Sequence, residues 1–201
     1  MNDSDEIIKQ ISHHAHMLAV LGKKIGYENI TDKTKWREVI MAGILGHIAF
    51  KKMSAGKKSD KYGSDAHDPI QDLNAEYKSK AVKESELNNL FQRIKNKKTN
   101  SRYVPIVISG VYNGAYNYES VNKYSKHDHY FGVFYEEICV LIIKVKTDYV
   151  IETLQEAVAK MLAKKNRTTT NGNSVAVSLG NTHLYEVVYQ NEEWFKNNVS
   201  I

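Results

Sequence analysis

Two apolar runs of strand length constrain the fold of this chain most strongly. Residues 103–112 read YVPIVISGVY, and residues 132–146 contain the run ICVLIIKVK. Strands that are apolar on both faces are stable only where both faces are covered. We therefore expect two buried strands, the second of them a single interior strand from Gly132 to Lys146.

Four other segments have the amphipathic spacing of helices: residues 4–26, 33–52, 84–95 and 149–165. Near the end, SVAVSL and HLYEVVY predict a hairpin that turns at Gly180-Asn181. The order of helices and strands predicts an α/β fold, a single domain with a central mixed β-sheet flanked by helices. A chain of 201 residues is the right size for one such domain.

Composition limits the cellular setting and the partners. No apolar run reaches the length of a membrane helix, and the start, MNDSDEIIKQ, lacks the character of a signal peptide. The single cysteine, Cys139, has no intrachain disulfide partner, which favours a reducing, cytoplasmic location. A formal net charge of +5 is compatible with nucleic acid but does not by itself indicate it.

The chemistry is concentrated between Gly63 and Lys80, GSDAHDPIQDLNAEYKSK. A strand through Asn74-Ala-Glu-Tyr-Lys-Ser places Glu76 and Lys78 on one face, because strand side chains alternate. The turn-forming residues near Pro69 would fold the chain back and bring Asp65 beside them. Carboxylate oxygens are the ligands that Mg²⁺ prefers, so we expect a magnesium site here.

An aspartate followed by Glu-x-Lys resembles the motif of the PD-(D/E)XK nuclease superfamily. The sequence around it, Gly-Ser-Asp-Ala-x-Asp and then Ala-Glu-Tyr-Lys-Ser, is most similar to type II restriction endonucleases. Ser64 stands where the strict motif has proline. The resemblance implies a restriction-endonuclease-like fold and Mg²⁺-dependent hydrolysis of double-stranded DNA to 5′-phosphate ends. It also implies a homodimer if the cleaved site is palindromic, and a cognate DNA methyltransferase that acts on the same site.

The same resemblance assigns roles to individual residues. Asp65, Glu76 and the Tyr77 carbonyl would hold the metal, and Lys78 would orient or deprotonate the attacking water. Asp68 is the competing candidate for Asp65. A glutamate on the helix before the core sheet often joins such sites, and Glu38 occupies that place; the helix dipole alone also explains an acid there.

Lysine- and asparagine-rich stretches supply candidate DNA contacts. A basic loop precedes Asp65, a further lysine follows the Glu-x-Lys motif, and the polar stretch 112–131 is a possible recognition loop. The candidate residues are Lys51, Lys52, Lys57, Lys58, Lys61, Lys80, Asn113, Asn117, Lys123 and Lys126. The catalytic core would then span 31–165, and a hairpin and tail 168–201, within one nuclease domain, 1–201.

Other interpretations stay open. Glu-x-Lys on a strand is often a solvated ion pair, and lysine-rich loops are usually just solvated. His13 and His16 share a helix face without further zinc ligands nearby, and His127-Asp128-His129 imitates a metal or acid–base cluster. A structure-selective repair nuclease and a non-catalytic DNA-binding protein remain alternatives to a restriction enzyme.

Overall fold

The computed structural model describes residues 3–24, 33–49, 64–83, 86, 107–163 and 172–198. Within them, the larger sheet has six strands in the order β1-β2-β3-β5-β6-β8. Only β3 and β5 run parallel; the other neighbours are antiparallel, so the sheet is mixed. Its strands are β1 (Ile48–Ala49), β2 (Ala66–Asp68), β3 (Leu73–Ala81), β5 (His127–Tyr135), β6 (Ile138–Val145) and β8 (Tyr185–Gln190).

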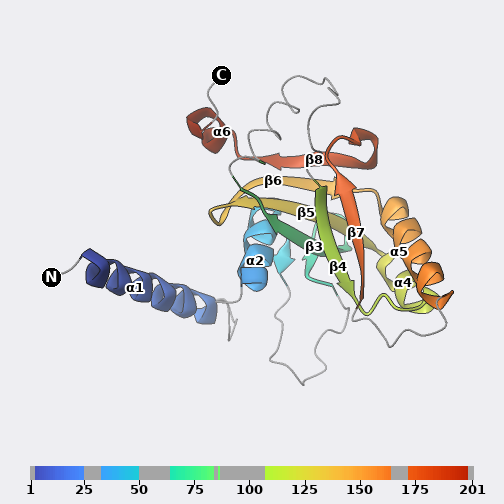
Figure 1. Ribbon diagram of the computed structural model, residues 1–201, viewed down its shortest axis with the longest axis horizontal. Helices are drawn as coiled ribbons and strands as arrows, with labels where there is room; N and C mark the ends of the chain where they lie inside the picture. Colours follow the sequence, from blue (N-terminus) through green and yellow to red (C-terminus); the bar gives the residue numbers. More distant parts are fainter. Residues whose placement is uncertain are drawn as a thin grey trace.

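A two-stranded antiparallel sheet, β4 (Val107–Asn113) with β7 (Gly172–Ser178), lies over one face of the larger sheet (Figure 1). Helices α4 (Tyr118–Tyr124) and α5 (Thr147–Leu162) lie on the same side. One apolar core fills this layer, with Phe131 and Ile143 from the large sheet against Leu154 of α5 and Val175 of β7.

Helix α2 (Lys33–Leu45) covers the opposite face. Its Met41 packs in a second core with Tyr130, Phe134 and Ile142. The central strands β5 and β6 are therefore buried on both faces, which is why their sequences are apolar at consecutive positions. The prediction of an α/β domain with a mixed central sheet flanked by helices is confirmed. Among the described residues, no helix is long and apolar enough to cross a membrane.

The predicted single interior strand from Gly132 to Lys146 is wrong, because the chain reverses inside it. Strand β5 ends at Tyr135 and β6 begins at Ile138, and the two pair antiparallel. Glu136 and Glu137 form the turn with φ angles of 43° and 67°. Two consecutive positive φ values give a tight hairpin turn that normally requires Asn or Gly, so these glutamates carried no turn signal.

Arg37 of α2 helps to explain this turn. Its guanidinium donates to both carboxylate oxygens of Glu137, over distances of 2.6 to 2.9 Å. Arg37 is buried, and a bidentate pair of this kind is among the stronger ion pairs. The side chain of Glu137 therefore ties the hairpin to α2 and offsets the strain of its backbone.

The end of the second helix differs from the prediction. The helix predicted over 33–52 ends at Leu45, where Gly46 has a φ of +71° and the chain continues into β1. Nothing lies within 4 Å of a methyl group added to Gly43 or Gly46, so neither glycine marks a close contact with another element. Gly46 instead ends the helix in the left-handed conformation that glycine favours.

The predicted C-terminal hairpin is also wrong. Strand β7 pairs with β4 in the small sheet, whereas β8 pairs with β6 in the large one. The turn after β7 and the short helix η1 (Thr182–Leu184) carry the chain between the sheets. Helix α6 (Glu192–Asn198) then packs Trp194 and Phe195 against the first core.

Candidate functional site

The hairpin predicted between Asp65 and Lys78 is present as β2 and β3, joined by a turn at 69–72. Asp65 lies just before β2 and is 5% exposed. Its backbone N–H donates to the Ala75 carbonyl, and its carboxylate accepts the Tyr77 N–H at 2.8 Å. The side chain of Asp65 thus extends the hydrogen bonding along this edge of β3 beyond the first residue of β2.

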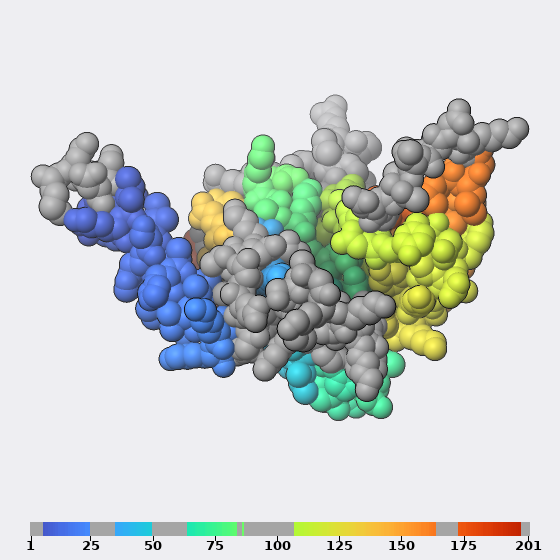
Figure 2. All heavy atoms as spheres, turned by 90° about the horizontal axis from the view of Figure 1, so that it is seen from below, coloured from blue at the N-terminus to red at the C-terminus, as the bar shows by residue number. Residues whose placement is uncertain are grey.

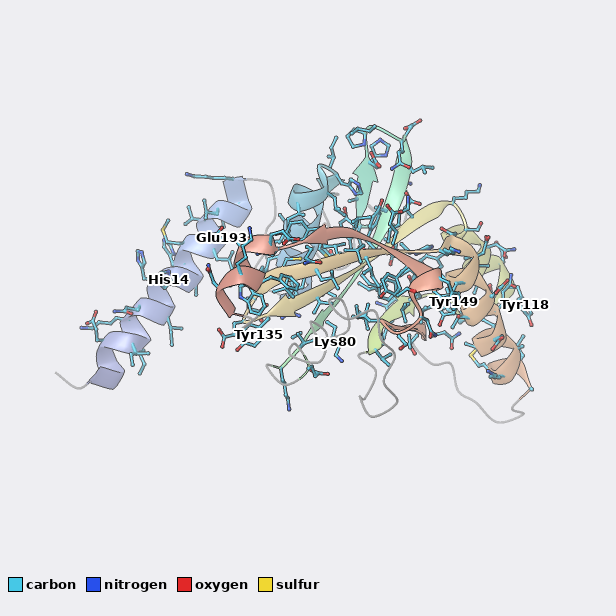
Figure 3. The ribbon with its side chains drawn as sticks, turned by 90° about the horizontal axis from the view of Figure 1, so that it is seen from above. His14, Lys80, Tyr118, Tyr135, Tyr149 and Glu193 are labelled. Carbon is cyan, nitrogen blue, oxygen red and sulfur yellow. The ribbon has the colours of Figure 1, made fainter. Side chains whose placement is uncertain are left out.

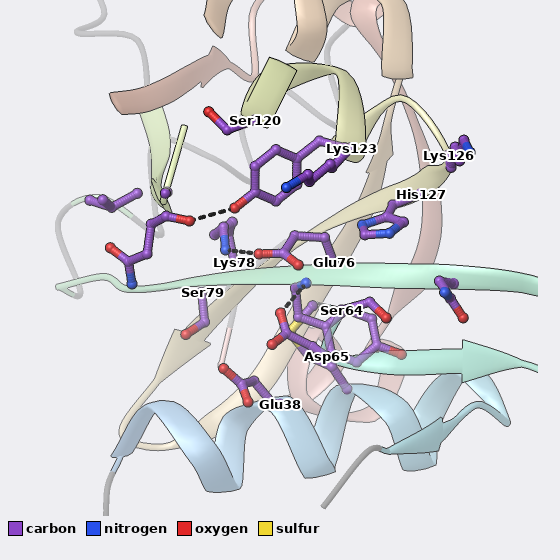
Figure 4. Close-up of a pocket in the computed structure, with 18 of the residues that line it drawn as sticks. Glu38, Ser64, Asp65, Glu76, Lys78, Ser79, Ser120, Lys123, Lys126 and His127 are labelled. Carbon is purple, nitrogen blue, oxygen red and sulfur yellow. Dashed lines mark hydrogen bonds and ion pairs between the residues drawn. The ribbon is translucent and has the colours of Figure 1, made fainter. Parts of the chain in front are cut away.

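This arrangement also directs the Tyr77 carbonyl. The N–H and C=O groups of one strand residue point to the same edge, and the Tyr77 N–H points to Asp65. The Tyr77 carbonyl is therefore on the same edge of β3 as the Asp65 carboxylate. Glu38 of α2 approaches this edge from below in Figure 4.

Glu76 and Lys78 project from one face of β3, as their spacing predicts (Figure 4). Lys78 Nζ lies 2.5 Å from Glu76 Oε1, and both side chains are largely buried. The ammonium also lies 4.6 Å from the centre of the Tyr112 ring, a distance typical of a cation–π contact. A carboxylate and an aromatic face together fix the position of the Lys78 amine.

Gly110 of β4 makes room for Lys78. A methyl group on Gly110 would collide with the Lys78 side chain, 2.6 Å from its Cβ and 2.5 Å from its Cδ. Glycine inside a strand often marks such a close approach. The isolated glycine within the apolar run YVPIVISGVY is the sequence signal for this contact.

A buried chain of hydrogen bonds holds Tyr112 beneath Lys78. His129 Nε2 lies 3.0 Å from the Tyr124 carbonyl, which only accepts, so this nitrogen carries the proton. Nδ1 therefore accepts from the Tyr112 hydroxyl at 3.1 Å. Burial lowers the pKa of His129 to about 4, which keeps the ring neutral in this role. The Tyr124 hydroxyl in turn donates to the Asn113 carbonyl at 2.6 Å.

The acids, Lys78, Gly110 and Tyr124 border one open cavity of about 1360 Å³. One wall carries the acids and Lys78 of β3, and the facing wall is formed by the end of β4, the turn at Gly114 and helix α4. Polar side chains line that second wall: Asn113, Tyr116, Glu119, Ser120, Asn122, Lys123 and Lys126. The predicted recognition loop over 112–131 is thus a turn, a helix and the start of β5, and much of it faces the acids.

Two buried polar atoms in the cavity wall have no hydrogen-bond partner among the described residues. They are Ser64 Oγ and His127 Nδ1, in residues that are 2% and 8% exposed. Burial lowers the pKa of His127, and the neighbouring Asp65 carboxylate acts in the opposite direction. Unpaired buried polar groups cost roughly 1–3 kcal/mol each, a cost that a bound polar ligand would offset.

The donor set at the β3 edge suits Mg²⁺ in its chemistry. Asp65, Glu76 and the Tyr77 carbonyl offer oxygen atoms only, and oxygen is the ligand atom that Mg²⁺ prefers. No group of three or more His, Cys, Asp and Glu side chains in the described ranges is arranged to hold a metal. Mg²⁺ is commonly bound by one or two carboxylates with waters and substrate phosphates, which two acids satisfy.

Asp68, the competing candidate, lies outside this cavity. Its carboxylate accepts from the Ile70 and Gln71 N–H groups and from the Gln71 amide, at 2.8 to 3.1 Å. The pKa of Asp68 is lowered: burial alone would raise it, but these hydrogen bonds outweigh burial. Asp68 is also 3.6 Å from Nε2 of His47, whose Nδ1 contacts the Tyr77 hydroxyl at 2.7 Å. These contacts make Asp68 the residue that shapes the turn.

The predicted DNA contacts divide into three groups. Lys123, Lys126 and Asn113 line the cavity. Lys80 instead donates to Glu86 and to the Val107 carbonyl, and Asn117 caps α4 by accepting from the Ser120 N–H. The basic loop residues lie outside the described part of the chain: Lys51, Lys52, Lys57, Lys58 and Lys61.

Within the part of the chain that the structure describes, neither histidine cluster belongs to a group of three or more side chains that could hold a metal. His13 and His16 lie exposed on α1 (Asp3–Lys24). On β5, His129 has both ring nitrogens engaged as described above, and Asp128 pairs with Lys144 at 2.7 Å. His127 and His129 share the cavity face of β5, whereas Asp128 faces the α2 side.

Comparison of the sequence with models of known protein families and with curated protein sequences gives no match.

Proposed function

We propose that this protein is a Mg²⁺-dependent endonuclease of double-stranded DNA, with the site selectivity of a type II restriction enzyme. The observation that carries the proposal is the cavity itself. Asp65, Glu76 and Lys78 meet on one wall, and a polar segment with two exposed lysines faces them. The fold proposed with it is restriction-endonuclease-like, and the proposed setting is the cytoplasm, beside a methyltransferase that acts on the same DNA site.

The chain's own groups have separable tasks in this proposal. Asp65 and Glu76 would hold Mg²⁺ with the Tyr77 carbonyl, and the ion would supply charge to offset that of the scissile phosphate. Lys78, which contacts Glu76 and the Tyr112 ring, would orient a water molecule and donate to a phosphate oxygen. The products expected from such hydrolysis carry 5′-phosphate and 3′-hydroxyl ends.

The facing wall would contact the DNA. Lys123 and Lys126 suit phosphates, while Asn113 and Asn122 carry the amide groups that read base edges. Ser64 and His127 offer the unpaired polar atoms that a phosphate or an ordered water would satisfy. If the DNA site is palindromic, two copies of the chain act together, because the symmetry of the site mirrors that of the protein.

The test is cleavage of unmethylated phage DNA with Mg²⁺, comparing wild type with Glu76→Gln. Glu152→Gln is the matched control, because Glu152 is an exposed acid on α5 away from the cavity. Discrete fragments from wild type and the control, lost with EDTA and in Glu76→Gln, are the expected result. Sequencing the fragment ends would then define the site.

Two other results would replace the proposal. Preferential cleavage of branched or flapped DNA would identify a structure-selective nuclease. Binding of DNA without metal-dependent cleavage, equal in all three proteins, would identify a non-catalytic DNA-binding protein.

A further inference from the structure

Helix α1 displays an apolar face that no described element covers. It is 22 residues long, and Figures 1 and 2 show it extending from one side of the body. No described helix or strand packs along its length. Its exposed apolar residues include Ile7, Ile11 and Leu21, which are 55%, 63% and 51% exposed.

The apolar face has the spacing of a coiled-coil seam. Ile7, Ile11, His14, Leu18 and Leu21 follow each other at intervals of four and three residues. An average spacing of 3.5 residues keeps a seam on one side of a supercoiled helix pair. His14 is the one polar member, and it lies at the middle of the seam (Figure 3).

The seam is complementary to itself when reversed. In an antiparallel pair that crosses at His14, Ile7 of one helix meets Leu21 of the other, and Ile11 meets Leu18. The helix begins with an acidic segment, DSDE, and ends with Lys23 and Lys24. Antiparallel pairing sets acidic ends against basic ends and also opposes the helix dipoles, whereas parallel pairing sets like charges together.

We propose that α1 pairs antiparallel with α1 of a second copy of this chain, with the two His14 residues at the twofold axis. A second copy is the partner that fits this apolar face best, because the same helix has an acidic start and a basic end that pair with each other when two copies run antiparallel. This inference does not depend on the nuclease proposal, and it is tested without DNA. A twofold pair of this kind would give a dimeric protein whose contact lies outside the cavity.

Cysteine cross-linking distinguishes the orientations. His14→Cys should give a disulfide-linked dimer on mild oxidation, because the two residues 14 meet at the axis. Ile7→Cys should not cross-link to itself, because residues 7 would lie about 20 Å apart along the antiparallel pair. The native Cys139 is buried, and burial raises the pKa of its thiol to about 12, so it should not react.

Sedimentation over a range of protein concentrations measures the association. Ile11→Glu should dissociate the dimer and leave the body folded, since Ile11 is exposed and belongs to neither apolar core. His14→Leu should tighten it by removing a polar residue from the seam. Replacing Lys23 and Lys24 with Glu should weaken it, and adding Glu6→Lys should restore part of the loss.

Each of three results would overturn the inference. The first is that the wild type and the His14→Leu variant both stay monomeric at all concentrations. The second is that the dimer persists in Ile11→Glu. The third is that Ile7→Cys forms the disulfide-linked dimer and His14→Cys does not. The first would mean that the face is covered by another part of this chain or by a different partner.

Discussion

The side chain of Lys78 lies directly against the backbone of Gly110 in β4, so that a methyl group added to Gly110 would be 2.6 Å from the Lys78 Cβ. Gly110→Ala should therefore displace Lys78 and separate it from Glu76. We expect cleavage to fall on the order of 10²-fold, the usual effect of misplacing a catalytic group by an ångström. The crowding should also lower the free energy of unfolding by about 1–3 kcal/mol. Steady-state cleavage and urea denaturation measure the two effects.

Gly43→Ala is the matched control. Gly43 lies in α2, is exposed, and has nothing within 4 Å of an added methyl group. The change should raise the free energy of unfolding by roughly 0.5–1 kcal/mol, because alanine restricts the unfolded chain and favours a helix. Cleavage should stay at the wild-type rate. Equal activity in the two glycine variants would mean that the position of Lys78 is unimportant.

Substituting the two aspartates tests the proposal that Asp65 holds the metal and that Asp68 only shapes the turn. In Asp65→Asn the amide oxygen still accepts the Tyr77 N–H, so the fold should persist while the charge is lost. We expect cleavage to fall by at least about 10²–10³-fold, as when a group that stabilises the transition state is removed. Isothermal titration with Mg²⁺ should show weaker binding.

Asp68→Asn should behave in the opposite way. Its amide oxygen still accepts from the turn N–H groups, but its NH₂ group now faces the Gln71 amide that donated to it. The expected cost is about 1 kcal/mol of stability, with cleavage unchanged. If Asp68→Asn abolishes cleavage and Asp65→Asn does not, the assignment of the two residues is reversed.

The acidic hairpin was predictable because its signals are local. Strand alternation alone puts Glu76 and Lys78 on one face, and the turn residues bring Asp65 back to the same strand. The contacts of Lys78 with Tyr112 and Gly110 depend on how β4 packs over β3. The sequence of either strand alone does not predict that packing. That relation is set by tertiary packing between segments about 30 residues apart.

The wrong predictions have a common physical origin. Glu136 and Glu137 have no intrinsic preference for positive φ, so the turn between β5 and β6 is held by the pair between Glu137 and Arg37. Likewise, β7 and β8 have a plausible turn between them but find other partners in two different sheets. Local turn chemistry is outweighed in both places by contacts between distant residues.

His129 predicts how stability depends on pH. The pKa of His129 in the folded protein is about 4, below its ordinary value of 6.5, because burial disfavours the cation. The unfolded chain therefore binds the proton more tightly, and stability should fall as the pH falls from about 6.5 towards 4. The contribution of this residue is about 3 kcal/mol over that window.

Comparison with His129→Asn isolates this contribution. The variant should be less stable at pH 7, because the Tyr112 hydroxyl loses its partner, but its stability should fall less on acidification. Urea denaturation at several pH values measures the difference. Parallel stability curves for the two proteins would show that His129 titrates normally and is not held neutral by burial.

Lys123 and Lys126 predict the salt dependence of DNA binding. Both line the cavity wall that faces the acids, and both are exposed. If each neutralises one phosphate, then each change to alanine should reduce the slope of log K against log[salt] by about 0.9. Fluorescence anisotropy in EDTA, which prevents metal-dependent cleavage during the measurement, gives the slope.

Lys160→Ala is the control for this measurement. Lys160 is exposed on α5 and pairs with Glu156, so its loss should leave the slope unchanged. A double change of Lys123 and Lys126 should lower the slope by about 1.8, because contacts with separate phosphates release their counterions independently. An unchanged slope in the double variant, with the slope of wild type itself large, would place the DNA away from this wall. In that case the DNA would have to reach Glu76 by contacting a different surface of the protein.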